Sequence, residues 1–452
     1  MNSIVIDCGA SFIKAAKFDK NGIMIKNLSY STKNQIDLVK ADDIDKDLPP
    51  ILQRTIFSIK RCICELSSEG EEIRFGLCNE MHGFVLTDEN LIPQIDYVSW
   101  QKELALVDFD EKQSYQNYFE KMIPKDYILR SGMPFKAGLP SSNLLYMFES
   151  GMLDNRKLYY FYSLGDFVLA WLSQMHVNCH LTNAAASGMV DMEKKTWNQE
   201  MIHVLNAENV IFPSIIDDIQ FFEMKWNKRT IHFKCALGDQ QAALLGADIE
   251  NENQISVNMG TGAQVSRCVE RLELSGDCQM RPYFKGCYLK TIPHIPSGRA
   301  LNVYFNFVKQ IITLFECNDT VCDEKIWEVI QEQIIMEEQK NNQESMLDMD
   351  MSFFTNAITK HDKGHISKIT EDNLNLGCLF YSAYCQMAQN VCQCIDKIAN
   401  VKQFDALVFS GGVIKKSSLL QKKIVANYQN VEVSIAENET LLGLFKYLQI
   451  KS

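Results

Sequence analysis

The sequence lacks the features that mark several protein classes. Its 452 residues include 15 cysteines and 8 histidines but contain no Cys-x-x-Cys pair and no His-Glu-x-x-His motif. Scattered cysteines of this kind are typical of small buried side chains in a reducing cytoplasm, so a zinc site is not expected. No apolar run is long enough to cross a membrane, and no signal peptide precedes the first strand at Ile4. We therefore expect a soluble cytoplasmic protein.

The chain is also short of positive charge. It has 45 Lys and Arg against 57 Asp and Glu, a formal net charge of -12. General affinity for DNA, RNA or anionic membranes is therefore not expected. An ATP site is not excluded, because a bound phosphate needs only a local positive potential. The length predicts two or three domains with sizeable cores.

The stretch Cys235–Gln264 combines a carboxylate with a glycine turn. Asp239 stands at the start of a buried helix expected through Ala242–Ala247, and a strand over Ile255–Asn258 ends in the turn Gly260-Thr261-Gly262. A carboxylate at a helix start can act as a base, and the turn exposes backbone N–H groups that can hold a phosphate. Each piece alone is more often an N-capping aspartate or an ordinary hairpin turn.

A similar hairpin opens the chain. The strand Ile4–Asp7 turns at Gly9 and returns through Ile13. Asp7 at the strand tip suits water-mediated Mg²⁺ binding beside a triphosphate, although a simple hairpin is the alternative. The two hairpins align at one constant offset, which places Gly9 on Gly260. Two such hairpins near the starts of two halves predict a duplicated fold with a nucleotide between the halves.

Polar and aromatic residues follow strands in the first half. A strand over Glu72–Cys78 leads into Glu80-Met81-His82-Gly83, and Ser99-Trp100-Gln101 follows another short strand. Polar groups at a strand tip suit a small polar substrate, and a tryptophan beside an amide suits the C–H faces and hydroxyls of a sugar. The alternatives are a satisfied loop histidine for His82 and core packing for Trp100.

The second half is expected to contain irregular loops over residues 280–284 and 292–302 and a polar, mobile linker over 337–350. A buried strand over Ala406–Ser410 then meets Gly411-Gly412. Two glycines at this point allow close approach by a flat nucleotide base.

Taken together, these segments resemble the FGGY carbohydrate kinases over nearly the whole chain. The matching segments are Asp7–Lys14 (first phosphate loop), Glu80–Gly83 (Gln-Met-His-Gly motif of the xylulokinase and sedoheptulokinase branches), Ser99–Gln101 (Trp-Gln-Asp), Gly238–Ala242 (catalytic aspartate), Asn258–Gly262 (second phosphate loop) and Ser410–Gly412 (adenosine segment). Within the family, Arg281–Phe284 and Ser297–Ala300 look most like the sedoheptulokinase-like branch.

The resemblance implies an α/β fold of two actin-like, ribonuclease-H-like domains around a central cleft for nucleotide and sugar. Residues 1–247 would hold the sugar site, the first phosphate hairpin and the catalytic aspartate, and residues 248–452 the second hairpin and the adenosine site. The implied reaction is ATP- and Mg²⁺-dependent phosphorylation of a primary hydroxyl of a ketose such as sedoheptulose or xylulose.

The resemblance also implies a set of site residues, with Asp239 as the general base. The implied sugar contacts are Met81, His82, Trp100, Gln101, Asp239 and Gln240; the nucleotide contacts are Asp7, Gly9, Ser11, Lys14, Gly260, Thr261, Gly262, Gly411 and Gly412; the metal ligands are Asp7 and Asp239. The expected partners are the sugar and ATP, without nucleic acid or membrane, and a homodimer is one assembly left open.

The sequence departs from the family pattern mainly at the sugar side. Lys102 stands where an aspartate is expected after Trp-Gln, Glu80 replaces a glutamine, and Ala10 replaces a threonine of the first loop. The glycine and arginine that usually follow a phenylalanine are absent around Phe353–Thr355. A degenerate kinase that senses sugar or nucleotide therefore stays open. An actin-like ATPase that binds proteins is a further alternative, although such proteins lack the Met-His-Gly and Gly-Asp-Gln-Gln segments.

Overall fold

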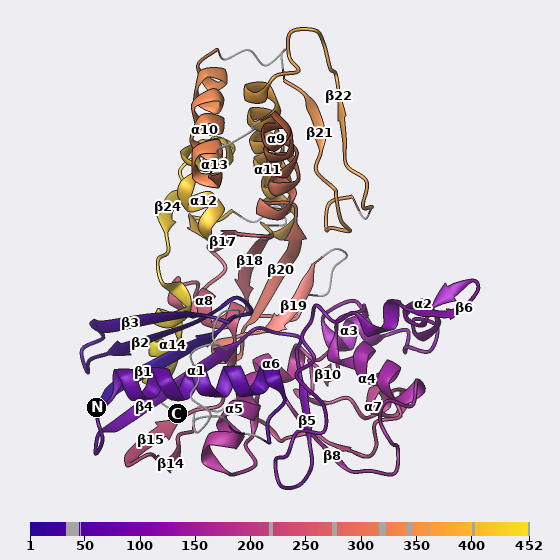
Figure 1. Cartoon of the computed structure of the whole chain (residues 1–452), viewed down its shortest axis with the longest axis vertical. Coiled ribbons are helices and arrows are strands. Elements are labelled where there is room, and N and C mark those ends of the chain that lie inside the picture. The colour runs from indigo at the N-terminus through magenta and orange to yellow at the C-terminus, as the bar shows by residue number, and fades with distance from the viewer. Residues whose placement is uncertain are drawn as a thin grey trace.

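The molecule has two lobes, each built on one large sheet (Figure 1). The computed structural model describes residues 1–32, 45, 47–216, 220–273, 278–315, 322–340, 346–359, 361–399 and 403–450. The first lobe holds the indigo-to-magenta part of the chain, and the second stands on it and holds most of the rest.

The sheet of the first lobe grows from the N-terminal hairpin. Its strands, in sheet order, are β14 (Phe222–Trp226), β15 (Arg229–Phe233), β4 (Glu72–Asn79), β1 (Asn2–Cys8), β2 (Phe12–Phe18) and β3 (Met24–Ser31). β1 is antiparallel to β2 and parallel to β4, and β15 is parallel to β4. The short strand β16 (Leu237–Gly238) pairs with the end of β4 and leads directly into Asp239.

The sheet of the second lobe repeats this ladder. Its strands, in sheet order, are β19 (Gln279–Pro282), β20 (Tyr288–Ile295), β18 (Ala263–Val269), β17 (Gln254–Met259), β23 (Ala406–Ser410) and β24 (Glu432–Ile435). β17 is antiparallel to β18 and parallel to β23, and β24 is parallel to β23. The expectation of a duplicated fold from the two hairpins is confirmed.

Two expectations for the second lobe were wrong. Residues 280–284 and 292–302 are not simply loops, because most of them belong to β19, to β20 or to the start of α9 (Gly298–Phe315). Prolines caused the error: Pro282 ends an edge strand, and Pro293 falls where the register between β18 and β20 shifts, two positions that tolerate a missing N–H.

The expected linker over 337–350 is also shorter than predicted. α10 (Asp323–Lys340) covers its first part, and β21 (Asp348–Asp350), which pairs with β22 (His365–Ser367), covers its last. Residues 341–345 lie outside the described residues.

Amphipathic helices pack on the two sheets. In α1 (Pro50–Leu66), Leu52, Ile56, Ile59 and Ile63 recur at helical spacing and are all fully buried against the first sheet. α11 (Leu376–Ala399) supplies the second core in the same way. Further helices are α4 (Pro140–Glu149), α5 (Leu164–Ser173), α6 (Leu181–Ala185), α12 (Gly412–Lys416) and α13 (Ser418–Val425). No helix in the described ranges is long and apolar enough to cross a bilayer.

Two helices join the lobes. α8 (Asp239–Gly246) crosses α14 (Glu439–Gln449), which lies among the strands of the first lobe although it follows the second in the chain (Figure 1). A Cβ added at Gly246 would lie 1.7 Å from the carbonyl oxygen of Glu439, and one at Gly443 would lie 1.7 Å from that of Ala242. Only glycine permits this reciprocal approach. The predicted domain division after residue 247 stays a prediction.

Candidate active site

Asp239 begins α8 at the end of β16, and Gly238, not Asp239, is the N-cap residue. The carboxylate oxygen Oδ1 accepts a 2.8 Å hydrogen bond from the N–H of Gln240. Burial raises the pKa of Asp239 to about 7, and the negative charge of Asp7 adds to this effect, whereas the Gln240 N–H and Arg281 oppose it. Asp239 therefore has a base strength suited to neutral pH and has another carboxylate as a neighbour.

Asp7 is the last but one residue of β1 and lies between two neighbouring strands. The ladder pairs it with Lys14 of β2 and with Cys78 of β4, whose Sγ donates to Asp7 Oδ1 at 3.5 Å. Burial raises the pKa of Asp7, as does the charge of Glu439, while Lys14 and the thiol lower it. Carboxylates from the first lobe and from the start of α14 therefore lie within electrostatic reach of one another.

The donor set of Asp7 and Asp239 fits a Mg²⁺ ion. Mg²⁺ prefers oxygen ligands and usually takes one or two carboxylates, completing its shell with water and substrate phosphates. The charge of Asp7 raises the pKa of Asp239, and a cation beside the two carboxylates would stabilise their ionised forms. Among the described residues, no group of three or more His, Cys, Asp or Glu could hold a metal by itself.

The glycine turns of both hairpins present backbone donors. The N–H of Gly9 donates to Phe12 O at 3.2 Å, and the N–H of Gly260 donates to Gly262 O at 3.0 Å. In the part of the chain that the structure describes, the N–H groups at the centres of these turns, those of Ala10 and Thr261, have no partner. These groups can donate to phosphate oxygens.

The segment expected to hold adenosine lies against the second hairpin. Asn258 Nδ2 donates to Ser410 Oγ at 2.8 Å. Gly411 has a φ of +91°, and a Cβ at this position would lie 2.5 Å from Met259 O. A side chain at Gly411 would therefore push the strand β23 away from the hairpin, so the contact requires glycine.

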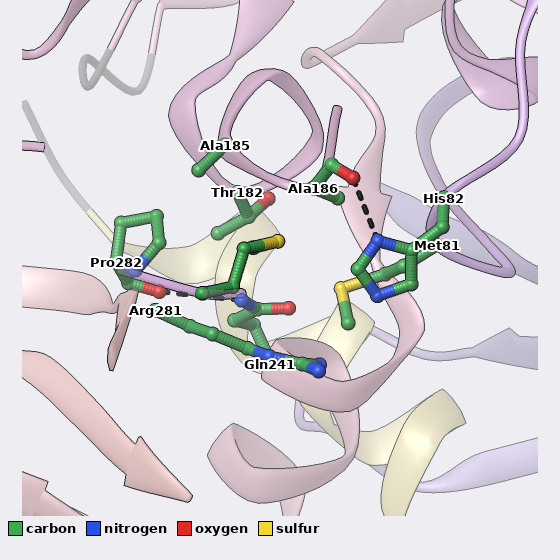
Figure 2. Close-up of a pocket in the computed structure, with 9 residues that line it drawn as sticks. Met81, His82, Thr182, Ala185, Ala186, Gln241, Arg281 and Pro282 are labelled. Atoms are coloured by element: carbon green, nitrogen blue, oxygen red, sulfur yellow. Dashed lines mark hydrogen bonds between the residues drawn. The ribbon is translucent and has the colours of Figure 1, made fainter. Parts of the chain in front are cut away.

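Met81 and His82 follow β4, and Met81 lies against the residue that precedes Asp239. A Cβ at Gly238 would lie 2.8 Å from Met81 Sδ, so Met81 packs on the residue before Asp239. His82 Nδ1 lies 2.6 Å from Ala186 O, and because a carbonyl can only accept, Nδ1 carries the proton and Nε2 is an acceptor (Figure 2). Burial, with the nearby charges of Arg281 and Lys136, holds the pKa of His82 well below its usual value, so the ring is neutral.

A small pocket lies around these side chains (Figure 2). The pocket is narrow and partly open, and it is lined by Met81, His82, Met133, Thr182, Ala185, Ala186, Gln241, Arg281 and Pro282. Gln241 Nε2 donates to Pro282 O at 3.3 Å, while its buried Oε1 has no partner among the described residues. The pocket thus offers acceptors for hydroxyl groups beside apolar side chains and the guanidinium of Arg281.

Glu80 fixes the tryptophan of the predicted sugar site. Its carboxylate accepts hydrogen bonds from Tyr97 Oη at 2.9 Å and from Trp100 Nε1 at 3.1 Å. Burial raises the pKa of Glu80. Trp100 is 44% exposed, so it is not a core residue, while Gln101 and Lys102 beside it are exposed. The structure therefore links Trp100 to the Met-His-Gly segment through Glu80.

The predicted sugar contact Gln240 is engaged elsewhere. Its Nε2 lies 3.2 Å from Ser266 Oγ and 3.3 Å from Thr291 Oγ1, and its Oε1 accepts from Arg281 Nη1. These three partners belong to the second lobe, so Gln240 connects the lobes at the start of α8. Its contact with a sugar stays a prediction, as do the roles of the other site residues.

Sequence reasoning missed four site residues: Gln241, Arg281, Lys136 and His294. Gln241 and Arg281 lay within motifs already singled out, but the segment with Arg281 was expected to be a loop. Arg281 lies in β19, which ends at Pro282, and His294 lies in β20 next to Pro293, so a proline obscured each strand in the sequence.

A family model described as the N-terminal domain of the FGGY family of carbohydrate kinases matches residues 3–246. A protein named probable L-xylulose kinase from Pasteurella multocida is 23% identical over 321 residues, 68% of this chain and 64% of that protein. The chain thus spans less than two thirds of that relative's length.

Two solved structures resemble the molecule over 99% of the chain and 89% of theirs. They are a ligand-bound xylulose kinase from Lactobacillus acidophilus (TM-score 0.76, 15% identity) and a gluconate kinase from the same species (TM-score 0.74, 16% identity). At these identities the likeness concerns the fold. The expected α/β fold of two actin-like, ribonuclease-H-like domains is confirmed.

Proposed function

Because the chain belongs to the FGGY family of carbohydrate kinases, we propose that it phosphorylates a primary hydroxyl of a ketose with ATP, with Asp239 as the general base. Xylulose and sedoheptulose are neutral members of this substrate class, and the xylulose kinase names of its relatives support the class. The observation that carries the proposal is the place of Asp239. It lies beside Met81 of the pocket and within electrostatic reach of Asp7 at the first hairpin.

In the proposed reaction, Asp239 accepts the proton of the sugar hydroxyl while that oxygen forms a bond to the γ-phosphorus and the bond to the ADP oxygen breaks. A base with a pKa of about 7 is well matched to this task at neutral pH. His82 Nε2 and Gln241 Oε1 accept hydrogen bonds from other hydroxyls and orient the sugar.

The two hairpins donate backbone N–H groups to the phosphates, and Gly411 and Gly412 receive the adenosine. Asp7 and Asp239 would hold Mg²⁺ partly through water, and the ion would supply positive charge beside the phosphates. Sugar and ATP are then the partners of a cytoplasmic enzyme that needs neither nucleic acid nor membrane. Sedimentation of the purified chain would decide whether it is a homodimer.

Sugar-stimulated release of ADP tests the proposal. We expect at least one ketose or polyol to raise ATP turnover well above the rate without sugar. Sugar or nucleotide binding without turnover would favour the degenerate kinase instead. ATP turnover that responds to a protein partner and to no sugar would favour the actin-like ATPase.

A further inference from the structure

Arg281 brings a positive charge into the pocket, where no acid forms a direct ion pair with it among the described residues. Its side chain is 6% exposed, Nη1 and Nη2 donate to the amide oxygens of Gln240 and Gln279, and Nε has no partner among the described residues. No carboxylate within the described ranges lies at ion-pair distance from the guanidinium. A buried charge whose hydrogen-bond partners are all neutral is costly. The charge of Asp239 acts on Arg281 and offsets part of this cost, and a bound anion would offset more.

Lys136 adds a second charge from the other lobe. The N–H of Met280, next to Arg281, donates to Gly132 O at 2.7 Å and thereby ties β19 to the loop that carries Lys136. Lys136 Nζ lies 2.8 Å from His294 Nε2, so the ammonium donates to a neutral ring. His294 has a φ of 59° at the register shift of β20, and such bulges redirect side chains.

Lys136 lies within electrostatic reach of Arg281, which lines the pocket. Burial and the positive charge of Arg281 lower the pKa of Lys136 to about 8, while Glu103 opposes both. Glu103 forms no ion pair with Lys136 in the described part of the chain, and the carboxylate of Glu80 is held by Tyr97 and Trp100.

We propose that the sugar bound in this pocket carries an anionic group, a carboxylate or a phosphate, and that Lys136 and Arg281 hold this group. The inference rests on the proposed function, because it narrows the class of sugar that the kinase accepts. An ammonium with two unused donors and a guanidinium with a free Nε form charge-assisted bonds to an oxyanion, which a neutral ketose cannot offer. His82 Nε2 and Gln241 Oε1 can still accept hydrogen bonds from the hydroxyl groups of this sugar.

Binding without ATP gives the first test. Calorimetry on the wild-type chain compares gluconate and fructuronate, as sugar acids, with xylulose phosphate and with the neutral ketoses xylulose and sedoheptulose. Charge-assisted hydrogen bonds predict that an anionic sugar binds about 10- to 100-fold more tightly than a neutral one. The affinities of the sugar acids and of xylulose phosphate then show whether the pocket prefers a carboxylate or a phosphate. Equal or tighter binding of a neutral ketose would overturn the inference.

The second test exchanges the charge on Lys136. Lys136→Gln should remove at least about tenfold of the preference for the anionic sugar, Lys136→Arg should keep most of it, and binding of neutral sugars should not change. Lys125→Gln, an exposed lysine earlier in the same segment, is the matched control. If Lys136→Gln raises the KM for ATP and leaves the sugar preference intact, the lysine serves the nucleotide and the inference is wrong.

Different results would contradict the proposed kinase activity and the proposed anion site. Binding is measured without ATP, so a preference for anionic sugars can be found or refuted whether or not any phosphoryl transfer occurs. Turnover of neutral ketoses with no gain from an anionic group would keep the kinase and reject the anion site.

Discussion

The two sheets repeat one hydrogen-bonding ladder but end in different chemistry. Where the first hairpin meets β4, Asp7 pairs with Cys78, and at the matching point of the second sheet Asn258 pairs with Ser410. In the first pair a thiol donates to a carboxylate at 3.5 Å, and in the second an amide donates to a hydroxyl at 2.8 Å. Both sheets have the same ladder of hydrogen bonds, but only the first sheet has a carboxylate at this position.

The charge differs between the lobes. The first lobe gathers carboxylates whose pKa burial raises, namely Asp7, Glu80 and Asp239. The second offers a neutral hairpin and two glycines, which a negatively charged nucleotide can approach without repulsion. Under the proposed function, the repeated scaffold would then carry the proton-accepting carboxylate in the first lobe only.

Asp239→Asn should give the largest effect, because it removes the basic group and keeps its size. We expect kcat to fall about 10²- to 10⁴-fold while sugar and ATP still bind. Asp248→Asn, which changes an exposed carboxylate just after the same helix, should leave kcat unchanged. Joint loss of binding and folding would instead make Asp239 structural.

Exchanging the paired residues tests the asymmetry directly. Asp7→Asn makes the first hairpin like the second, and loss of a water-mediated metal partner should weaken the Mg²⁺ dependence of turnover about 10- to 100-fold. Asn258→Asp makes the reverse change and should raise the KM for ATP through repulsion of phosphate. The asymmetry would lose its functional meaning if both exchanges left the Mg²⁺ titration and the KM for ATP unchanged.

The sequence predicted the repeated parts well and the contacts between distant segments poorly. The hairpins, the helix at Asp239 and the place of Gly411 follow from local patterns that survive folding. Arg281 and His294 could not be assigned, because their roles depend on an edge strand and a bulge that bring them to Lys136 of the other lobe. A local sequence pattern does not show which distant segments come into contact in the folded chain.

Gly443→Ala tests the crossing where the two halves join. The new Cβ would overlap Ala242 O, so α14 must move away from α8. Overpacking of this kind costs about 1–3 kcal/mol of the free energy of unfolding, or somewhat more. Gly412→Ala, which meets no atom within 4 Å, is the control in the same denaturation experiment. A Gly443→Ala chain as stable as the control would mean that the crossing can relax freely.

The smallest expected effect concerns a second pair of matching positions. Lys17 lies opposite Ile4 in the first ladder, and Arg267 lies opposite Ile255 in the second. Lys17 Nζ forms a 2.8 Å ion pair with Glu71, a partner that can titrate. Arg267 instead donates to the carbonyl oxygens of three residues that do not titrate, those of Glu252, Ala399 and Gln403.

The stability that the Lys17–Glu71 pair contributes should therefore depend on pH, whereas that from Arg267 should not. Burial would raise the pKa of Glu71, but hydrogen bonds from Lys17, Asn2 and the N–H of Ser68 bring it below its ordinary value. Its contribution to stability is then fully present above the unfolded pKa, about 4.3, and is lost as pH falls through the lower folded pKa. Glu71→Gln should cost about 1 kcal/mol near neutral pH and almost nothing near pH ~3, measured by urea unfolding. If Glu71→Gln lowers the free energy of unfolding equally at both pH values, Glu71 acts by packing. The Lys17–Glu71 pair and the Arg267 hydrogen bonds would then differ in their partners but not in their response to acid.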